Sequence, residues 1–165
     1  MSRDVRAATP EDLPQLTDIY NHYVLSGHST FDLEPFGVED RKEWFSHYGE
    51  TGPYRLLVAV QGSHVLGYAT SSRFRPRPAY RTSVEISAYC DPQATGRGVG
   101  SALYTALFHG LADEGLHRAF AGIALPNDPS VALHRRFGFR KIGVYTEAGH
   151  KFGRYWDVLW LERPL

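Results

Sequence analysis

The segment from Thr95 to Ser101 places three glycines among seven residues, in the order Thr-Gly-Arg-Gly-Val-Gly-Ser. Before it, residues 82–90 are rich in β-branched and apolar side chains, which predicts a strand. After it, leucines recur at helical spacing, which predicts a helix over about 100–114. Glycine lets the chain turn sharply between these elements and leaves the first N–H groups of the helix accessible, which favours phosphate binding. A tight turn without a ligand is the alternative interpretation.

Helix and strand patterns alternate along the rest of the chain. Thr9-Pro10-Glu11-Asp12 is typical of a helix start, and that helix is expected to reach about Leu25. Further helices are expected over 38–47 and 129–137, and strands over 3–8, 54–61, 64–74, 82–90, 117–124, 140–147 and 154–162. This alternation predicts an α/β layer structure, with one domain over residues 1–165. The unit at 82–124 predicts a parallel strand pair joined by a right-handed crossover.

The charge balance excludes a global attraction to polyanions. The chain has 18 basic and 18 acidic residues, so we expect no nucleic-acid partner. No apolar run approaches the roughly 20 residues of a membrane span, and the polar start differs from a signal peptide. We therefore expect no membrane partner and a cytoplasmic location. Cys90 is the only cysteine and the histidines lack metal-ligand spacing, so we expect no metal.

Three common catalytic or nucleotide-binding patterns do not fit. No lysine follows the last glycine, as a P-loop requires. Ser101 stands where a dinucleotide fingerprint starting at Gly96 needs its third glycine. The chain also contains no Gly-x-Ser-x-Gly elbow, which disfavours a Ser-His-Asp hydrolase.

Three stretches in a fixed order, Ser29–Pro35, Thr82–Ser101 and Leu125–Phe139, carry a resemblance to a known family. Together they resemble the GNAT acyltransferase superfamily, most closely its phosphinothricin N-acetyltransferase branch, which includes methionine sulfoximine and sulfone acetyltransferases. The similarity runs from about Ile19 to Val158, most of the chain. It implies a GNAT fold, with a mixed central sheet of about six to seven strands flanked by helices on both faces. It also implies transfer of an acetyl group from acetyl-CoA to the α-amine of a small glutamate-like amino acid.

The resemblance also implies which residues hold acetyl-CoA. Backbone groups of Ala88, Tyr89 and Cys90 are expected to pair with the pantetheine arm, and Asn127 to contact the co-substrate further along. The pyrophosphate is expected on Gly96, Arg97, Gly98, Val99, Gly100 and Ser101. The family usually has Gln or Arg three residues before Gly98, where this chain has Thr95. Either Arg97 supplies the missing phosphate contact or the affinity for CoA is lower.

Glu85 and His134 are the candidate catalytic residues. Amine acetylation requires a neutral nitrogen, and a carboxylate in a restricted cleft can accept the ammonium proton. Glu85 is a charged residue in an otherwise apolar and hydroxyl-bearing strand; an exposed face or an ion pair with Arg81 is the alternative. His134 matches the branch's histidine and is expected to relay a proton, unless it only packs beside Phe137. Direct transfer is expected, because a lone cysteine such as Cys90 is more often simply packed.

The acceptor is expected at an arginine-rich loop over residues 73–81. Guanidinium groups bind carboxylates and phosphinates through paired hydrogen bonds, which suits a glutamate-like amino acid. With the resemblance, this assigns acceptor binding to Phe31, Glu34, Arg73, Arg75 and Tyr80. A solvated loop or an RNA contact is the alternative. The family also implies a homodimer, to which aromatic residues near the C-terminus are expected to contribute unless they fill the core.

Other functions remain open from sequence alone. The same chemistry is compatible with another acceptor, such as a protein N-terminus, a polyamine or an antibiotic amine. A non-catalytic CoA-binding module is the alternative from a different functional class. The joint presence of Glu85 and His134 favours an enzyme, because a binding module has no evident use for both.

Overall fold

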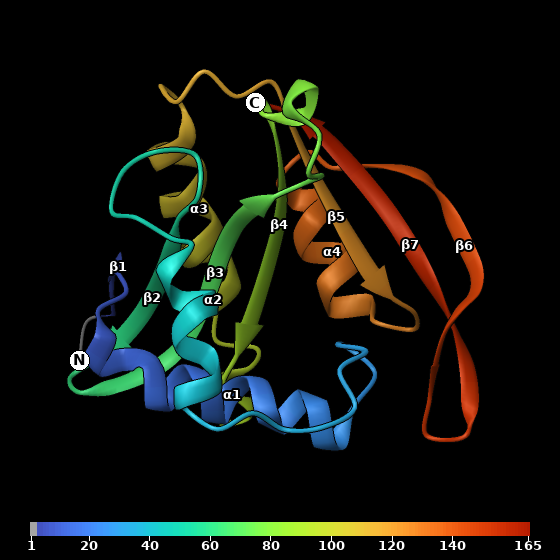
Figure 1. Cartoon of the computed structure of the whole chain (residues 1–165), viewed down its shortest axis with the longest axis horizontal. Helices are drawn as coiled ribbons and strands as arrows, with labels where there is room; N and C mark the ends of the chain where they lie inside the picture. Colours follow the sequence, from blue (N-terminus) through green and yellow to red (C-terminus); the bar gives the residue numbers. More distant parts are fainter. Residues whose placement is uncertain (1–2) are drawn as a thin grey trace.

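The computed structural model describes residues 3–165, in which a seven-stranded sheet forms the central layer (Figure 1). Its order is β1-β2-β3-β4-β5-β7-β6. The strands are β1 (Asp4–Ala7), β2 (Leu56–Gln61), β3 (His64–Arg73), β4 (Ser83–Cys90), β5 (Arg118–Ala124), β6 (Arg140–Lys151) and β7 (Arg154–Pro164). The helices are α1 (Leu13–Ser26), α2 (Lys42–Ser46), α3 (Val99–Leu111) and α4 (Asp128–Arg136), with 3₁₀ turns η1 (Pro10–Asp12), η2 (Glu39–Arg41), η3 (Pro78–Tyr80) and η4 (Pro92–Ala94).

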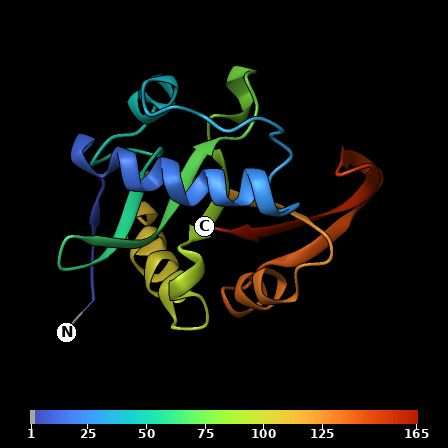
Figure 2. The same cartoon turned by 90° about the horizontal axis from the view of Figure 1, so that it is seen from below.

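The helices cover both faces of the sheet, which confirms the expected layers. α1 and α2 lie on one face, and α3 and α4 lie on the other (Figure 2). The split follows from the alternation of side chains along the strands. On β2, Val58 packs with Leu16 of α1, whereas its neighbour Ala59 packs with Leu103 of α3. None of the helices in residues 3–165 combines the length and the apolar character that a membrane crossing requires.

The parallel pair β4–β5 parts soon after it begins. Only three residues of each strand are in register: Ser83 with Arg118, Val84 with Ala119, and Glu85 with Phe120. Beyond Glu85, β4 stays paired with β3 as far as Cys90, while β5 stays paired with β7. The sheet therefore opens in its middle, and beyond Glu85 one edge of β4 has no strand partner among residues 3–165 (Figure 1).

The long β6–β7 hairpin forms one edge of the sheet, and its turn lies away from the other strands, on the side of the loop that follows α1 (Figures 1 and 2). The sequence predicts that its first strand stops at Glu147, but a bulge stands there and pairing resumes at Gly149. Glu147 has φ 53°, and its N–H donates to Asp157 Oδ1 at 2.7 Å, so the displaced backbone remains satisfied. The hairpin thus extends to a turn at Phe152–Gly153, both with positive φ.

Contacts from this hairpin hold the loop that follows α1. Lys151 is buried, and its Nζ donates to the Thr30 carbonyl at 2.9 Å. The rings of His28 and Trp156 stack at 4.1 Å. The Phe31 ring lies so close to Gly149 that an added Cβ would come within 2.2 Å of it. The position of Phe31 therefore depends on the absence of a side chain at residue 149.

We expect Gly149→Ala to lower the free energy of unfolding by about 1–3 kcal/mol, because the new methyl group must displace the Phe31 ring. Gly143→Ala on the same strand is the matched control, since nothing lies within 4 Å of its added Cβ. Urea unfolding of both variants makes the comparison. Equal stabilities of the two variants would contradict the close packing of Phe31 on this strand.

Candidate active site

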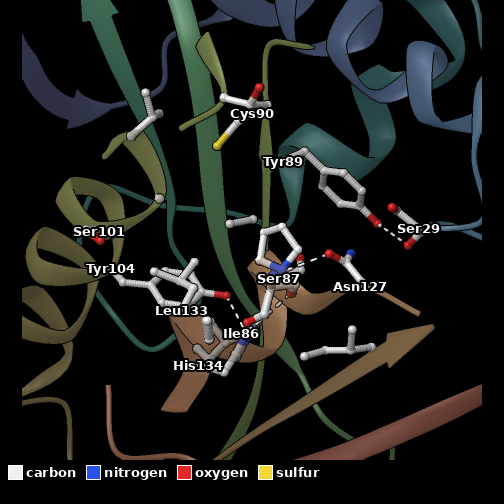
Figure 3. A pocket seen from close by; sticks show the side chains of 18 of the residues that line it. Ser29, Ile86, Ser87, Tyr89, Cys90, Ser101, Tyr104, Asn127, Leu133 and His134 are labelled. Carbon is white, nitrogen blue, oxygen red and sulfur yellow. Dashed lines mark hydrogen bonds between the residues drawn. The ribbon is translucent and has the colours of Figure 1, made fainter. Parts of the chain in front are cut away.

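A cavity of about 870 Å³ occupies the opening between β4 and β5 (Figure 3). One wall is the unpaired edge of β4, residues 86–90, and the opposite wall is the end of β5, residues 122–124. The glycine segment before α3 closes one end, and the first turns of α4 close another. Segments that are distant in sequence therefore meet around a single elongated space.

The glycine segment is shaped to bind an anion. Gly96 and Gly98 have φ of 72° and 75°, which favour glycine, and nothing lies within 4 Å of a Cβ added at Gly96. Gly98 is the N-cap of α3, so the first N–H groups of the helix face the end of the cavity without intrahelical acceptors. A Cβ at Gly100 would meet Leu133 at 2.9 Å, so glycine there lets α3 approach α4. These features fit a diphosphate joined to a long arm between the strands.

Most residues that the sequence assigns to acetyl-CoA line this cavity. They are Ala88, Tyr89, Cys90, Gly96, Gly98, Val99, Gly100, Ser101 and Asn127. Arg97 is not among the lining residues. Its Nη2 instead donates to Gln61 Oε1 at 3.4 Å, at the turn between β2 and β3. Thr95 does line the cavity, and its hydroxyl donates to the Pro92 carbonyl.

His134 is buried and lies against Tyr104, with which it lines the cavity (Figure 3). Its Nδ1 is 2.7 Å from the Ser130 carbonyl, which only accepts, so Nδ1 carries a proton. In the neutral ring, Nε2 then accepts from the Tyr104 hydroxyl at 2.9 Å. Burial lowers the pKa of His134, although the bond to Ser130 opposes that effect. His134 is therefore a neutral imidazole with both nitrogens engaged.

The thiol of Cys90 also lies at the cavity wall. Burial raises its pKa, and a hydrogen bond from the Gly100 backbone only partly offsets this. The Cys90 carbonyl accepts from the Tyr23 hydroxyl at 2.5 Å, which joins α1 to the end of β4. The thiol is consequently protonated and weakly nucleophilic near neutral pH.

Glu85 stands where β4 and β5 separate, as the last residue of β4 paired with β5. Its side chain shares a face of the sheet with Ser87 and Tyr89, both of which line the cavity. Burial raises the pKa of this carboxyl, and the nearby Arg75 guanidinium acts in the opposite direction. No ion pair with Arg81 forms among the described residues. Glu85 is thus a partly desolvated base next to the cavity.

Part of the arginine-rich loop packs on Phe120, the residue of β5 that is paired with Glu85. Phe74 stacks on Phe120, the register partner of Glu85, with ring centroids 4.2 Å apart. Arg75 lies 4.3 Å over the Phe74 ring, and the partly exposed Tyr80 meets that ring edge-on at 5.7 Å. Arg75 and Tyr80 therefore lie together on the Glu85 side of the opening.

The other residues assigned to the acceptor lie apart from this cluster. The Arg73 guanidinium donates to the Pro76 carbonyl within its own loop. Phe31 packs on Gly149, and Glu34 is exposed in the loop before α2. None of the five residues assigned to the acceptor lines the cavity itself.

The structure adds cavity residues that sequence reasoning missed, notably Tyr23, Ser29 and Tyr104. Tyr104 lies on the apolar face of α3, where its spacing indicates only a core position. Ser29 also lines the cavity, and its carbonyl accepts a hydrogen bond from the Tyr89 hydroxyl at 3.4 Å. This contact joins segments that are 60 residues apart in the sequence. Within residues 3–165, no group of three or more His, Cys, Asp or Glu side chains is arranged to hold a metal ion.

A family model, curated proteins and solved structures were found to be similar to this chain. The family model described as "Acetyltransferase (GNAT) domain" matches residues 5–160. A phosphinothricin N-acetyltransferase from Streptomyces coelicolor is 58% identical over 98% of this chain and 95% of its own length. An L-methionine sulfoximine/L-methionine sulfone acetyltransferase from Pseudomonas paraeruginosa is 36% identical over 100% of this chain and 96% of its own. The crystal structure of a phosphinothricin acetyltransferase from Sinorhizobium meliloti in complex with AcCoA has a TM-score of 0.94 at 36% identity, covering 100% of this chain and 89% of that one.

The buried imidazole predicts acid sensitivity of the fold. Because the pKa of His134 is lowered on folding, its contribution to stability is fully present above the unfolded value of about 6.5 and is lost as pH falls toward the folded pKa. We expect the His134 ring to remain neutral at pH 6.5 in an NMR titration. Urea unfolding of His134→Gln is expected to show a smaller loss of stability between pH 6.5 and 5 than the unmodified protein. A His134 midpoint above 6.5 would contradict this reading of the site.

Proposed function

The chain belongs to the GNAT acetyltransferase family and is an acetyl-CoA-dependent N-acetyltransferase, and we propose that its acceptor is the α-amine of a small amino acid of the phosphinothricin or methionine sulfone type. The observation that carries the proposal is a partly desolvated carboxylate, Glu85, at the point where the strands open. Beside it, Arg75 and Tyr80 offer a cation and a ring to an amino acid with an acidic or polar end.

Glu85 is proposed as the general base. When bound, acetyl-CoA supplies a thioester carbonyl that an amine nitrogen attacks. The amine is an ammonium ion in free solution, so it must first lose a proton, which the Glu85 carboxylate accepts directly or through water. Partial burial makes this carboxylate a stronger base than a solvated one, while Arg75 keeps it ionised.

When the C–S bond of the thioester breaks, the departing thiolate takes a proton, which is proposed to be the one that the amine gives up, passed on by Glu85 or water. The Tyr104–His134 pair is proposed to position the thioester at the opposite wall of the cavity. The Tyr104 hydroxyl carries a proton and is oriented by His134 Nε2. His134 is held by the Ser130 carbonyl and is neutral, so it acts through Tyr104 and not as a free imidazolium. His134 is therefore a positioning residue in this proposal.

Direct transfer to the amine is proposed because the one thiol at the site is unsuited to carry an acetyl group. The thiolate is the nucleophilic form of cysteine, and burial raises the pKa of Cys90. The Cys90 side chain therefore shapes the cavity wall, and Glu85 and the acceptor perform the chemistry.

A homodimer is also proposed, with the β6–β7 hairpin at its interface. Five large apolar side chains of this hairpin are exposed, namely Ile142, Val144, Tyr145, Phe152 and Tyr155. Exposed apolar side chains gathered on one arm are typical of an association surface. The same hairpin holds the loop that carries Phe31, so association would take place next to the acceptor side.

The activity is tested by mixing the protein with acetyl-CoA and phosphinothricin or L-methionine sulfone, where we expect release of free CoA thiol. Glu85→Gln is expected to reduce kcat/KM by about 10²- to 10⁴-fold, because the amide cannot accept the ammonium proton. Calorimetry is expected to show unchanged acetyl-CoA binding, and Glu43→Gln, an exposed position on α2, is the matched control. Full activity of Glu85→Gln would remove that residue from its role. Turnover of peptides but of no free amino acid would reject the acceptor.

The pH profile tests the electrostatic link between Glu85 and Arg75. Burial raises the carboxyl pKa above its ordinary 4.5, so kcat/KM is expected to fall on acidification with a midpoint above that value. Arg75→Met removes the opposing positive charge and is expected to move the midpoint to still higher pH. Arg81→Met, in the same loop, is expected to leave it in place. If the midpoint does not move in Arg75→Met, the loss of activity at low pH does not report the protonation of Glu85.

A further inference from the structure

A second cavity, of about 350 Å³, lies on the α1/α2 face of the sheet. Its floor is formed by hydroxyl groups of β3 and β4, with Thr70 Oγ1 2.8 Å from Ser87 Oγ and Ser72 Oγ 2.9 Å from the Tyr48 hydroxyl. Its roof comes from α1, η2 and α2. The volume is that of an amino-acid-sized molecule, and the lining is aromatic and polar, as in small-ligand sites.

The notable group in this cavity is the guanidinium of Arg41. The residue is only 6% exposed, and its Cζ lies 4.4 Å from the Tyr20 ring centroid and 3.8 Å from that of Trp44. No carboxylate within residues 3–165 lies within 4 Å of it, and its buried Nε has no hydrogen-bond partner there. Burying a cation without an anion is costly, and aromatic rings compensate only in part.

The acidic side chains of the cavity are already engaged elsewhere. Asp32 accepts a hydrogen bond from the Tyr20 hydroxyl, and Asp40 accepts from the Gly37 N–H at 2.9 Å. Neither carboxylate pairs with Arg41, although both line the same space. The arrangement leaves Arg41 with donors for a planar anion, and a carboxylate matches the guanidinium fork.

This cavity adjoins the catalytic opening. Ser87 and Tyr89 line both cavities, so the two spaces meet along β4. On the same face, Glu85 is one alternate position before Ser87 and is the register partner of Ser72 on the floor. The cavity that holds Arg41 therefore borders the stretch of β4 that begins two residues after Glu85.

We infer that Arg41 binds the α-carboxylate of the acceptor, and this inference rests on the function proposed above. An α-amino acid carries its amine on the carbon next to the carboxylate, so an acid group on Arg41 directs the amine toward the β4 opening. Arg75, on the far side of Glu85, is then free for an acidic or polar group at the other end of the molecule. The arrangement selects free amino acids against peptide N-termini and polyamines, neither of which has a carboxylate beside its amine.

The experiment is a double-perturbation cycle, in which residue 41 of the protein and the α-carboxylate of the substrate are changed separately and together. Initial rates are measured for L-methionine sulfone, whose only carboxylate is the α-carboxylate, and for its α-carboxamide. The unmodified protein is expected to prefer the acid by about 10- to 100-fold in kcat/KM, the range of one charge-assisted contact. In Arg41→Gln that preference is expected to fall to within about threefold, while acetyl-CoA binding is unchanged. Lys42→Met, which removes an exposed cation one residue away, is the control and is expected to keep the full preference.

The outcomes separate this inference from the proposed function. If Arg41→Gln slows both substrates by the same factor, or if the unmodified protein does not distinguish acid from amide, the contact is overturned and amino-acid acetylation stands. If the unmodified protein binds acetyl-CoA but acetylates neither substrate, the proposed function fails and this inference fails with it. Arg41→Lys keeps the positive charge but not the fork, and is expected to show an intermediate preference. It provides the comparison if Arg41→Gln does not fold.

Discussion

The early parting of β4 from β5 is the constraint on which the rest of the structure depends. A parallel pair that stayed in register would fill the middle of the sheet with hydrogen bonds and leave no room between the strands. Here pairing stops at Glu85, so the edge of β4 is free and α3 and α4 can deliver their N-terminal turns to the opening. The last paired position is occupied by Glu85, whose carboxyl pKa is raised by burial. The geometry that creates the cavity thus also places the Glu85 carboxyl beside it.

Charge is distributed differently on the two sides of the opening. On the α3/α4 side, His134, Tyr104 and Cys90 are all held in uncharged forms by burial and by mutual or backbone hydrogen bonds. On the α1/α2 side, burial raises the pKa of the Glu85 carboxyl, and the positive charge of Arg75 opposes that shift. Neutral groups suit the side that faces a thioester, whereas a zwitterionic acceptor requires charged partners. Strand β4 lies between these two environments.

Much of the architecture could be predicted from the sequence, because local signals suffice for it. The glycine segment and the alternating strands and helices predicted the layers, and the family resemblance supplied most of the residues that line the cavity. Properties that arise from contacts between distant segments could not be predicted. The surroundings of the Arg41 guanidinium, which packs on Tyr20 and Trp44, are built by separate helices, and the hydrogen bond of the Tyr104 hydroxyl reaches a histidine 30 residues away. The bulge at Glu147 escaped prediction because the carboxylate of Asp157 satisfies it from the neighbouring strand.

Because successive side chains of β4 point to opposite faces, this single strand serves two sites, and α1 with the loop that follows it also contributes side chains to both. The glycine segment and α4 enclose one site, and α1, α2 and their connecting loop enclose the other. Under the inference above, substitutions in η2 and α2, which line only the second site, change which amine is accepted and leave the glycine segment and α4 unaltered. Such a division makes the scaffold readily adaptable in evolution: new acceptors can be recruited by altering one layer, with the donor layer inherited unchanged.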